Sequence, residues 1–172
     1  GCRSILVEKP AGLDKTEIGE VAELADRLGA QVFVAYNRRF YSSIQSLREQ
    51  ANRDGGLISI NFDFSEVGRE IETLPHPDSV KNNWFLANST HVVDAAFFLA
   101  GLPVVLEAHV SGGLPWHPKG EAFTGAGVTD KDVLFSYHAN WRGPGRWGIQ
   151  AVSAEHRFVL QPMESLMVQK HG

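Results

Sequence analysis

Two short apolar runs near the start of the chain limit its fold more than any other feature. "RSILVE" (3–8) and "QVFVAY" (31–36) read as buried strands, because apolar residues run through both without a helical period. Between them Asp14 is suited to cap a helix, apolar residues recur at helical spacing, and Gly29 is suited to end it. The pattern predicts a strand, helix, strand unit with parallel strands and a right-handed crossover.

A single unit of this kind does not form a stable sheet by itself, because parallel strands need cover on both faces and neighbours on both edges. The first strand also starts without a preceding turn or helix cap. We therefore expect this sequence to begin partway through a longer protein.

After residue 56 the pattern changes from buried strands to alternating ones. Residues 42–56 are expected to form a connecting helix, and "LISINFDFS" (57–65) alternates apolar with polar residues, which predicts a strand with one covered face. Residues 66–83 are polar and are expected to be loop, whereas "STHVVDAAFFLAG" (89–101) predicts a second clear helix. Further strands are expected at 105–110, 132–142, 146–154 and 157–162, with a long glycine- and proline-rich connection after the first of them.

The composition excludes several classes of partner. The 172 residues are 43% hydrophobic and carry a formal net charge of -4 without a long basic run, so neither nucleic acid nor an anionic membrane is an expected partner. No run of about 18 apolar residues is present, so no membrane span is expected. Cys2 is the single cysteine, which favours a reducing compartment and a cytoplasmic protein.

"GPGRWG" (143–148) matches the glycine pattern of dinucleotide-binding loops, but its surroundings do not. That pattern requires a preceding strand and a helix that begins within it, so that helix amides face the phosphates. Here strand-like sequence lies on both sides, and Pro144 removes one backbone donor. We interpret the segment as a hairpin turn rather than a nucleotide site.

Two stretches carry side chains suited to chemistry. Lys9 lies in "EKP" at the carboxyl end of the first strand, where open α/β sheets place ligands. His91 lies in the first turn of the helix expected at 89–101, where the helix amino terminus would keep its ring neutral and ready to accept a proton. A surface Glu-Lys pair and a locally capped histidine remain open as alternatives. The seven histidines include no close pair at helical ligand spacing, so no metal site is expected.

Taken together and in this order, "VEKPAG", "VAYNRRF" and "STHVVDAAFFLAG" resemble motifs of the glucose-fructose oxidoreductase and inositol dehydrogenase family. The resemblance implies an α+β (α/β) fold: an open, largely antiparallel sheet with helices on one face, preceded by the last βαβ unit of a Rossmann domain. Residues 1–38 would be the end of that dinucleotide-binding domain. Residues 39–172 would be a substrate and oligomerisation domain, incomplete at its carboxyl end, and the phosphate-binding loop would precede Gly1.

The resemblance also implies roles for individual residues. Lys9 would hydrogen-bond the reacting oxygen, and His91 would take the hydroxyl proton as hydride passes to NAD or NADP. The Lys9 to Pro10 peptide bond is expected to be cis. The implied cofactor-binding residues are Glu8, Lys9, Pro10 and Arg38, and the implied substrate contacts are Tyr36, Asn37, Trp84, Asn88 and Asp94.

The sequence departs from the family at Ala87, where many members carry an aspartate four residues before the histidine. His91 would then need another group to orient it, such as Asn88 or Asp94. The expected function is an NAD(P)-dependent oxidoreductase of a sugar, polyol or similar hydroxylated molecule, assembled as a homo-oligomer through the open sheet. Two alternatives stay open: a non-catalytic binding or oligomerisation module derived from the family, and a hydrolase or lyase that uses nicotinamide transiently.

Overall fold

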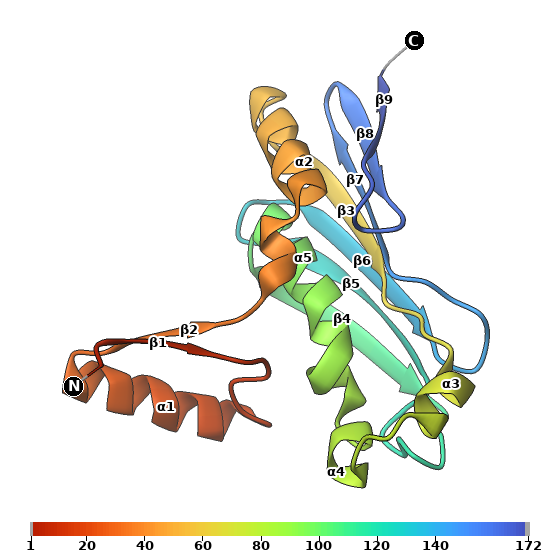
Figure 1. Ribbon diagram of the computed structural model, residues 1–172. Helices are drawn as coiled ribbons and strands as arrows, with labels where there is room; N and C mark the ends of the chain where they lie inside the picture. The colour runs from red at the N-terminus through yellow and green to blue at the C-terminus, as the bar shows by residue number, and fades with distance from the viewer. Residues whose placement is uncertain (1, 171–172) are drawn as a thin grey trace.

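The computed structural model describes residues 2–170, and these residues form two separate sheets (Figure 1). The smaller sheet pairs β1 (Ser4–Val7) with β2 (Gln31–Val34) in parallel, and α1 (Lys15–Leu28) joins the two strands. This is the strand, helix, strand unit that the sequence predicts.

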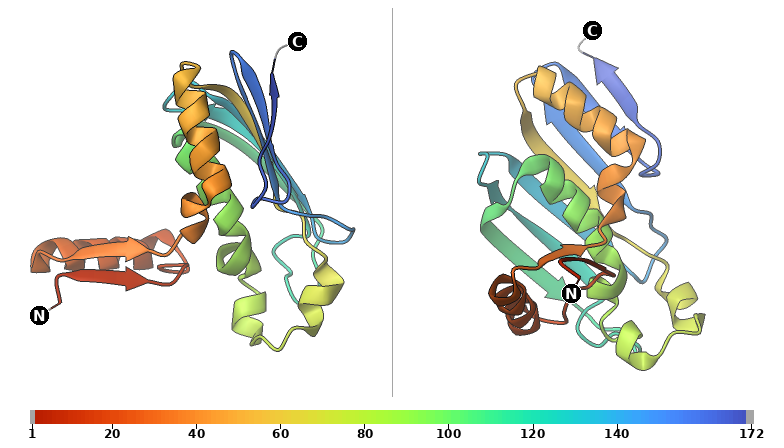
Figure 2. Two further views of the ribbon diagram at one scale, coloured as in Figure 1. Left: turned by 45° about the horizontal axis from the view of Figure 1, so that its top comes forward. Right: turned by 60° about the vertical axis from the view of Figure 1, so that its left-hand side comes forward.

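Local sequence fixes both ends of α1. The carboxylate of Asp14 accepts hydrogen bonds from the backbone N–H groups of Thr16 and Glu17, and Gly29 ends the helix in the left-handed conformation. The unit stands apart from the larger sheet (Figure 2). Large apolar side chains therefore stay exposed on it, among them those of Ile5, Leu6, Leu24, Leu28 and Phe33.

The larger sheet contains seven strands within residues 2–170, in the order β4-β5-β6-β3-β7-β8-β9. Neighbouring strands are antiparallel except β3 and β6, which are parallel, so the expected largely antiparallel open sheet is confirmed. The strands are β3 (Leu57–Asp63), β4 (Pro103–Ser111), β5 (Ala122–Thr129), β6 (Leu134–Asn140), β7 (Gly148–Ser153), β8 (His156–Leu160) and β9 (Met167–Lys170).

Two helices, α2 (Ser42–Arg53) and α5 (Thr90–Ala100), cover one face of this sheet and leave the other face open (Figure 2). A 3-10 helix (Asn37–Phe40) leads from β2 into α2, and the expected domain boundary after residue 38 falls within it and stays a prediction. None of the helices described here has the length and apolar character needed to span a lipid bilayer.

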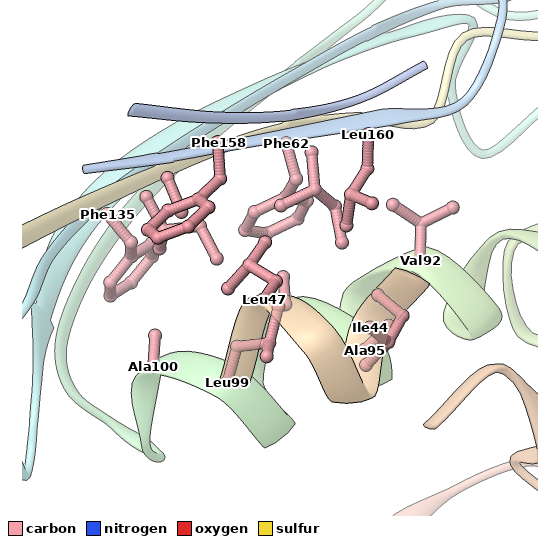
Figure 3. Packing of buried hydrophobic residues seen from close by; sticks show 14 of the residues in the cluster. Ile44, Leu47, Phe62, Val92, Ala95, Leu99, Ala100, Phe135, Phe158 and Leu160 are labelled. Atoms are coloured by element: carbon pink, nitrogen blue, oxygen red, sulfur yellow. The ribbon is translucent and has the colours of Figure 1, made fainter. Parts of the chain in front are cut away.

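The hydrophobic core lies between the sheet and these two helices (Figure 3). Along β3, Ile60 and Phe62 are buried while Asn61 is exposed, so the alternation in the sequence marks the covered face correctly. Full burial of one such side chain stabilises the fold by roughly 1.5–3 kcal/mol. The helices contribute Ile44, Leu47, Val92, Ala95, Leu99 and Ala100, and the strands contribute Phe62, Phe135, Phe158 and Leu160.

A cluster of Ser, His and Asp side chains fastens α2 to the hairpin between β7 and β8. Asp54, which follows α2, accepts a hydrogen bond from Ser153 Oγ at 2.5 Å and lies 2.8 Å from His156 Nδ1. Because the carboxylate stands between the other two side chains, serine and histidine are not arranged as nucleophile and base. The cluster is structural.

Two parts of the chain differ from the expectation. The connection expected after residue 110 contains β5, whose Gly125 and Gly127 hide its strand character. A Cβ on Gly125 would lie 2.5 Å from the Tyr137 ring, and one on Gly127 would lie 1.8 Å from the Val105 carbonyl oxygen, so close packing requires both glycines. The expected loop at 66–83 contains the short helices α3 (Gly68–Thr73) and α4 (Asp78–Lys81).

The interpretation of "GPGRWG" as a hairpin turn is wrong. Residues 141–147 join β6 to β7, but β3 lies between these two strands, so the connection crosses the end of β3. Gly145 packs against that end, where an added Cβ would lie 2.2 Å from the Cβ of Ser65. The glycine thus allows a close approach between two chain segments, and no helix begins here.

Candidate functional site

The loop after β1 meets the amino-terminal end of α5. The Lys9 ammonium donates a hydrogen bond to the backbone carbonyl of Ala87, and the Lys9 to Pro10 bond is cis, as expected. Ala87 belongs to a π-helical turn (Phe85–Ser89) directly before the helix that carries His91. The structure therefore brings the EKP segment and the start of the histidine helix together. At Ala87, where many family members carry an aspartate, the backbone carbonyl accepts the hydrogen bond from Lys9.

His91 is buried and neutral at the start of α5. Its side chain lies among rings, with the Tyr36 ring centre 6.1 Å away and the Trp147 ring centre 6.3 Å away. Burial, followed by the positive charges of Lys9 and Arg38, lowers the pKa of His91 from 6.5 to about 4. The low pKa expected from the sequence thus has burial as its largest cause, and the ring is ready to accept a proton at neutral pH.

The Nδ1 atom of His91 is buried and has no hydrogen-bond partner within residues 2–170. Neither Asn88 nor Asp94 orients the ring, because both side chains are bound elsewhere. A buried polar atom without a partner is costly, and it commonly marks a place where a ligand or water completes the site.

Lys9 is partly buried beside the same ring. Burial lowers the pKa of Lys9 below its ordinary value of 10.5, and Arg38 lowers it further. The carboxylates of Glu8 and Glu66 oppose this shift. The charge of Arg38 therefore lowers the pKa of both Lys9 and His91.

Glu66 is the residue that sequence reasoning missed. It lies in the segment expected to be a polar loop, but its carboxylate accepts hydrogen bonds from Trp84 Nε1, Asn88 Nδ2 and Ser89 Oγ, each at 2.9 Å. Burial raises the pKa of Glu66 above its ordinary value, and these hydrogen bonds oppose the rise. No local pattern identifies such a residue, because its partners lie 18 to 23 positions away.

Glu66 lines a cleft of about 570 Å³. Lys9 and His91 are not on its wall, but the centre of the His91 ring lies 6.3 Å from that of Trp147, which is. Three of the expected site residues, Arg38, Trp84 and Asn88, lie on its wall. The connection that contains the glycine pattern, which the sequence analysis did not place at a site, supplies another part of the wall. Its members are Gly145, Arg146 and Trp147.

Other expected site residues lie away from the cleft. Both oxygens of Asp94 bind the guanidinium of Arg39, at 2.7 and 2.5 Å, and Asp94 and Tyr36 line a separate hollow of about 350 Å³. Asn37 accepts a hydrogen bond from Arg38 on the surface, and Glu8 is exposed. Asp94 thus fastens the 3-10 helix to α5, and its role as a substrate contact stays a prediction without support from this geometry.

Two further features of the described residues bear on the choice of site. A third hollow, of about 390 Å³, lies between α5 and the larger sheet, but its wall is mostly apolar and holds none of the expected site residues. Within residues 2–170, no three His, Cys, Asp or Glu side chains come together in a way that could hold a metal ion.

Comparison with known proteins supports the fold. No family model and no curated protein matches the sequence. Among solved structures, a UDP-N-acetylglucosamine 3-dehydrogenase from Acidithiobacillus ferrooxidans is 16% identical with a TM-score of 0.76, and the match covers 96% of this chain and 52% of that one. A levoglucosan dehydrogenase solved with NADH and L-sorbose is 17% identical with a TM-score of 0.77, covering 97% and 50%.

An oxidoreductase from Thermotoga maritima is 14% identical with a TM-score of 0.74, and the match covers 96% of this chain and 53% of that one. The chain therefore spans about half the length of these proteins and shares their fold along nearly all of its own length. The expected resemblance and fold class are confirmed at the level of the fold.

Proposed function

We propose that this chain is part of an NAD(P)-dependent oxidoreductase of the glucose-fructose oxidoreductase and inositol dehydrogenase family, acting on a sugar, polyol or similar hydroxylated molecule. The observation that carries the proposal is the closeness of Lys9 to a neutral, buried His91, whose pKa the lysine charge lowers. The fold shared with sugar dehydrogenases supports it.

The residues present fit the nicotinamide end of such a cofactor and the oxygen that reacts with it. His91 offers a neutral imidazole, and Lys9 offers an ammonium close enough to lower the pKa of that ring. Arg38 and Glu8 lie close enough to shift the pKa of Lys9, and Pro10 follows Lys9 in the chain. When bound, the nicotinamide supplies the hydride acceptor, and the protein supplies the proton transfer.

In this proposal His91 accepts the proton of the substrate hydroxyl, because its ring is neutral above a pH of about 4. Lys9 donates a hydrogen bond to the same oxygen and stabilises the negative charge that develops on it. The indole of Trp84 and the amide of Asn88 on the cleft wall give the mixed apolar and polar surface that binds small polar molecules.

The experiment that tests the function uses the protein as its own cells make it, with its intact mass measured first. Purified protein is mixed with NAD⁺ or NADP⁺ and with levoglucosan, L-sorbose, UDP-N-acetylglucosamine or myo-inositol, and reduced nicotinamide is followed by absorbance. We expect reduction with at least one pair. Product without net reduced nicotinamide would support a hydrolase or lyase instead, and the absence of any turnover would support a non-catalytic module.

We also propose that the open face of the larger sheet binds a second copy of the chain. Leu134 is 59% exposed and Val105 is 55% exposed, and both line a shallow hollow on this face beside the polar side chains of Asn61 and Gln150. Exposed apolar side chains in such a setting are common at protein interfaces.

The variant Leu134→Asp is expected to shift the protein toward the monomer in light scattering at micromolar concentration, because a carboxylate at a buried interface loses its hydration. Asn52→Asp is the matched control, since it adds the same charge to the exposed surface of α2, on the other side of the sheet. A wild-type protein that is monomeric under these conditions would contradict the proposal.

A further inference from the structure

The Glu66 carboxylate holds the chain segment that leads into the histidine helix. Its Oε2 accepts hydrogen bonds from Trp84 Nε1 and Asn88 Nδ2, and its Oε1 accepts one from Ser89 Oγ. Asn88 and Ser89 belong to the π-helical turn directly before His91, and Trp84 immediately precedes that turn. One side chain beyond the end of β3 therefore fixes three neighbours of the candidate base.

An ionised carboxylate only accepts hydrogen bonds, and this fixes the orientation of Asn88. The Asn88 amide must turn its NH₂ group toward Glu66. Its Oδ1 then has no hydrogen-bond partner within residues 2–170, and Asn88 lies on the cleft wall. The oxygen is available to a hydroxyl group that donates from a bound molecule.

The charge of Glu66 also acts on Lys9. The charged or titratable groups around this lysine are Glu8 in its own segment, Arg38 from the 3-10 helix, Glu66 from the end of β3 and His91 from α5. Glu66 and Glu8 favour the protonated lysine, and Arg38 disfavours it. Loss of the Glu66 charge alone would therefore make Lys9 easier to deprotonate.

We propose that Glu66 is a positioning residue of this site, which holds Asn88 so that its carbonyl oxygen accepts a hydrogen bond from a hydroxyl of the substrate. This inference rests on the proposed function, and it narrows the substrate to molecules with a free hydroxyl near the reacting carbon. Glu66 itself acts through Asn88 and Lys9.

The test compares Glu66→Ala with Glu66→Gln in the whole protein. Alanine removes the acceptor, so nothing at residue 66 holds the NH₂ group of Asn88 and its Oδ1 no longer has a fixed direction toward the cleft. The expected result is a rise in KM of about 2- to 10-fold, the range for a lost hydrogen bond between neutral groups, with a smaller fall in kcat.

In Glu66→Gln, the amide oxygen can take the place of Oε2 and accept from Trp84 Nε1 and Asn88 Nδ2, while the NH₂ group donates to Ser89 Oγ. KM is therefore expected to stay close to the wild-type value in this conservative variant. The alkaline limb of kcat/KM is expected to move to lower pH in Glu66→Gln, because Lys9 loses a carboxylate that raises its pKa. A merely structural role for Glu66 does not predict this pH shift, and the absence of either the pH shift or the rise of KM in Glu66→Ala would overturn the inference.

A measurement without turnover separates this inference from the proposed function. In nitrogen-edited NMR of the wild-type protein, the side-chain NH₂ signals of Asn88, assigned by their loss in Asn88→Asp, are expected to shift as Glu66 is protonated and to move in Glu66→Ala. Signals that stay fixed in both cases would refute the Glu66 contact even in an active enzyme. Coupled signals in a protein without dehydrogenase activity would instead refute the function and leave the contact standing.

Discussion

Replacement of His91 by alanine in the whole protein is expected to lower kcat by about 10²- to 10⁴-fold, the usual contribution of a positioned general base. The reason is that His91 is the neutral imidazole beside Lys9, and its buried Nδ1 is free of protein partners in the part of the chain that the structure describes. The measurement is steady-state turnover at saturating substrate, with folding checked by circular dichroism.

The same residue predicts an unusual pH dependence. Because the pKa of His91 is lowered to about 4, the ring is neutral throughout the neutral range and becomes protonated only as pH falls through that value. The acid limb of kcat/KM is therefore expected near pH 4, well below the value of 6.5 that an unperturbed histidine would give. An acid limb near 6.5 would show that another group, or a hydrated His91, acts as the base.

A control for this variant is Asn52→Ala, which removes an exposed side chain from α2, on the other side of the sheet from the proposed interface. This change is expected to leave turnover within about twofold of the wild type, because surface substitutions away from special features have small effects. Unchanged turnover in His91→Ala would reject the assignment of the base, whereas equal losses in both variants would indicate a general effect on folding.

Sequence reasoning succeeded where local pattern and local structure agree. Asp14 and Gly29 end α1 as expected, and the alternation along β3 separates the buried Phe62 from the exposed Asn61. It failed at β5, because Gly125 and Gly127 are signals of a loop in the sequence. Only the neighbouring strands, which approach too closely for a side chain, show why glycine stands in this strand.

In the candidate site, too, residues in short local motifs could be predicted from the sequence, whereas residues defined by distant contacts could not. Lys9 and His91 could be proposed because each lies in a short motif, and the structure brings their segments together. Glu66 could not, because its three donors reach it only after β3, the π-helical turn and the helix start have packed. The sequence places Asp94 close to His91, but Arg39, 55 residues away, occupies both of its oxygens.

The tryptophan that supports this arrangement gives the largest expected effect on stability. Trp141 is fully buried, stacks on Trp116 with ring centres 5.9 Å apart, and contacts the Phe123 ring at 4.9 Å. Its Nε1 donates to the Phe64 carbonyl at 3.2 Å, and its own carbonyl accepts from Gly68 N at 2.9 Å. Phe64 and Gly68 lie on either side of Glu66 in the sequence, so Trp141 supports the position of that carboxylate.

Trp141→Ala is therefore expected to lower the free energy of unfolding by about 3–5 kcal/mol, the cost of removing a large aromatic side chain from a packed core. Urea unfolding followed by circular dichroism measures this change. Trp141→Phe is the matched control, because it keeps a ring in the stack and loses chiefly the hydrogen bond to Phe64, at a cost of about 1–3 kcal/mol for the unsatisfied carbonyl.

If Trp141 also holds the Glu66 segment in place, Trp141→Ala should change substrate binding even in the fraction of the protein that remains folded. Under conditions where Trp141→Ala is still folded, KM is expected to rise as it does in Glu66→Ala, because the segment from Phe64 to Gly68 loses the side-chain hydrogen bond to the Phe64 carbonyl. An alanine variant with normal KM in its folded fraction would show that β3 and the hydrogen bonds of Glu66 hold this segment without Trp141.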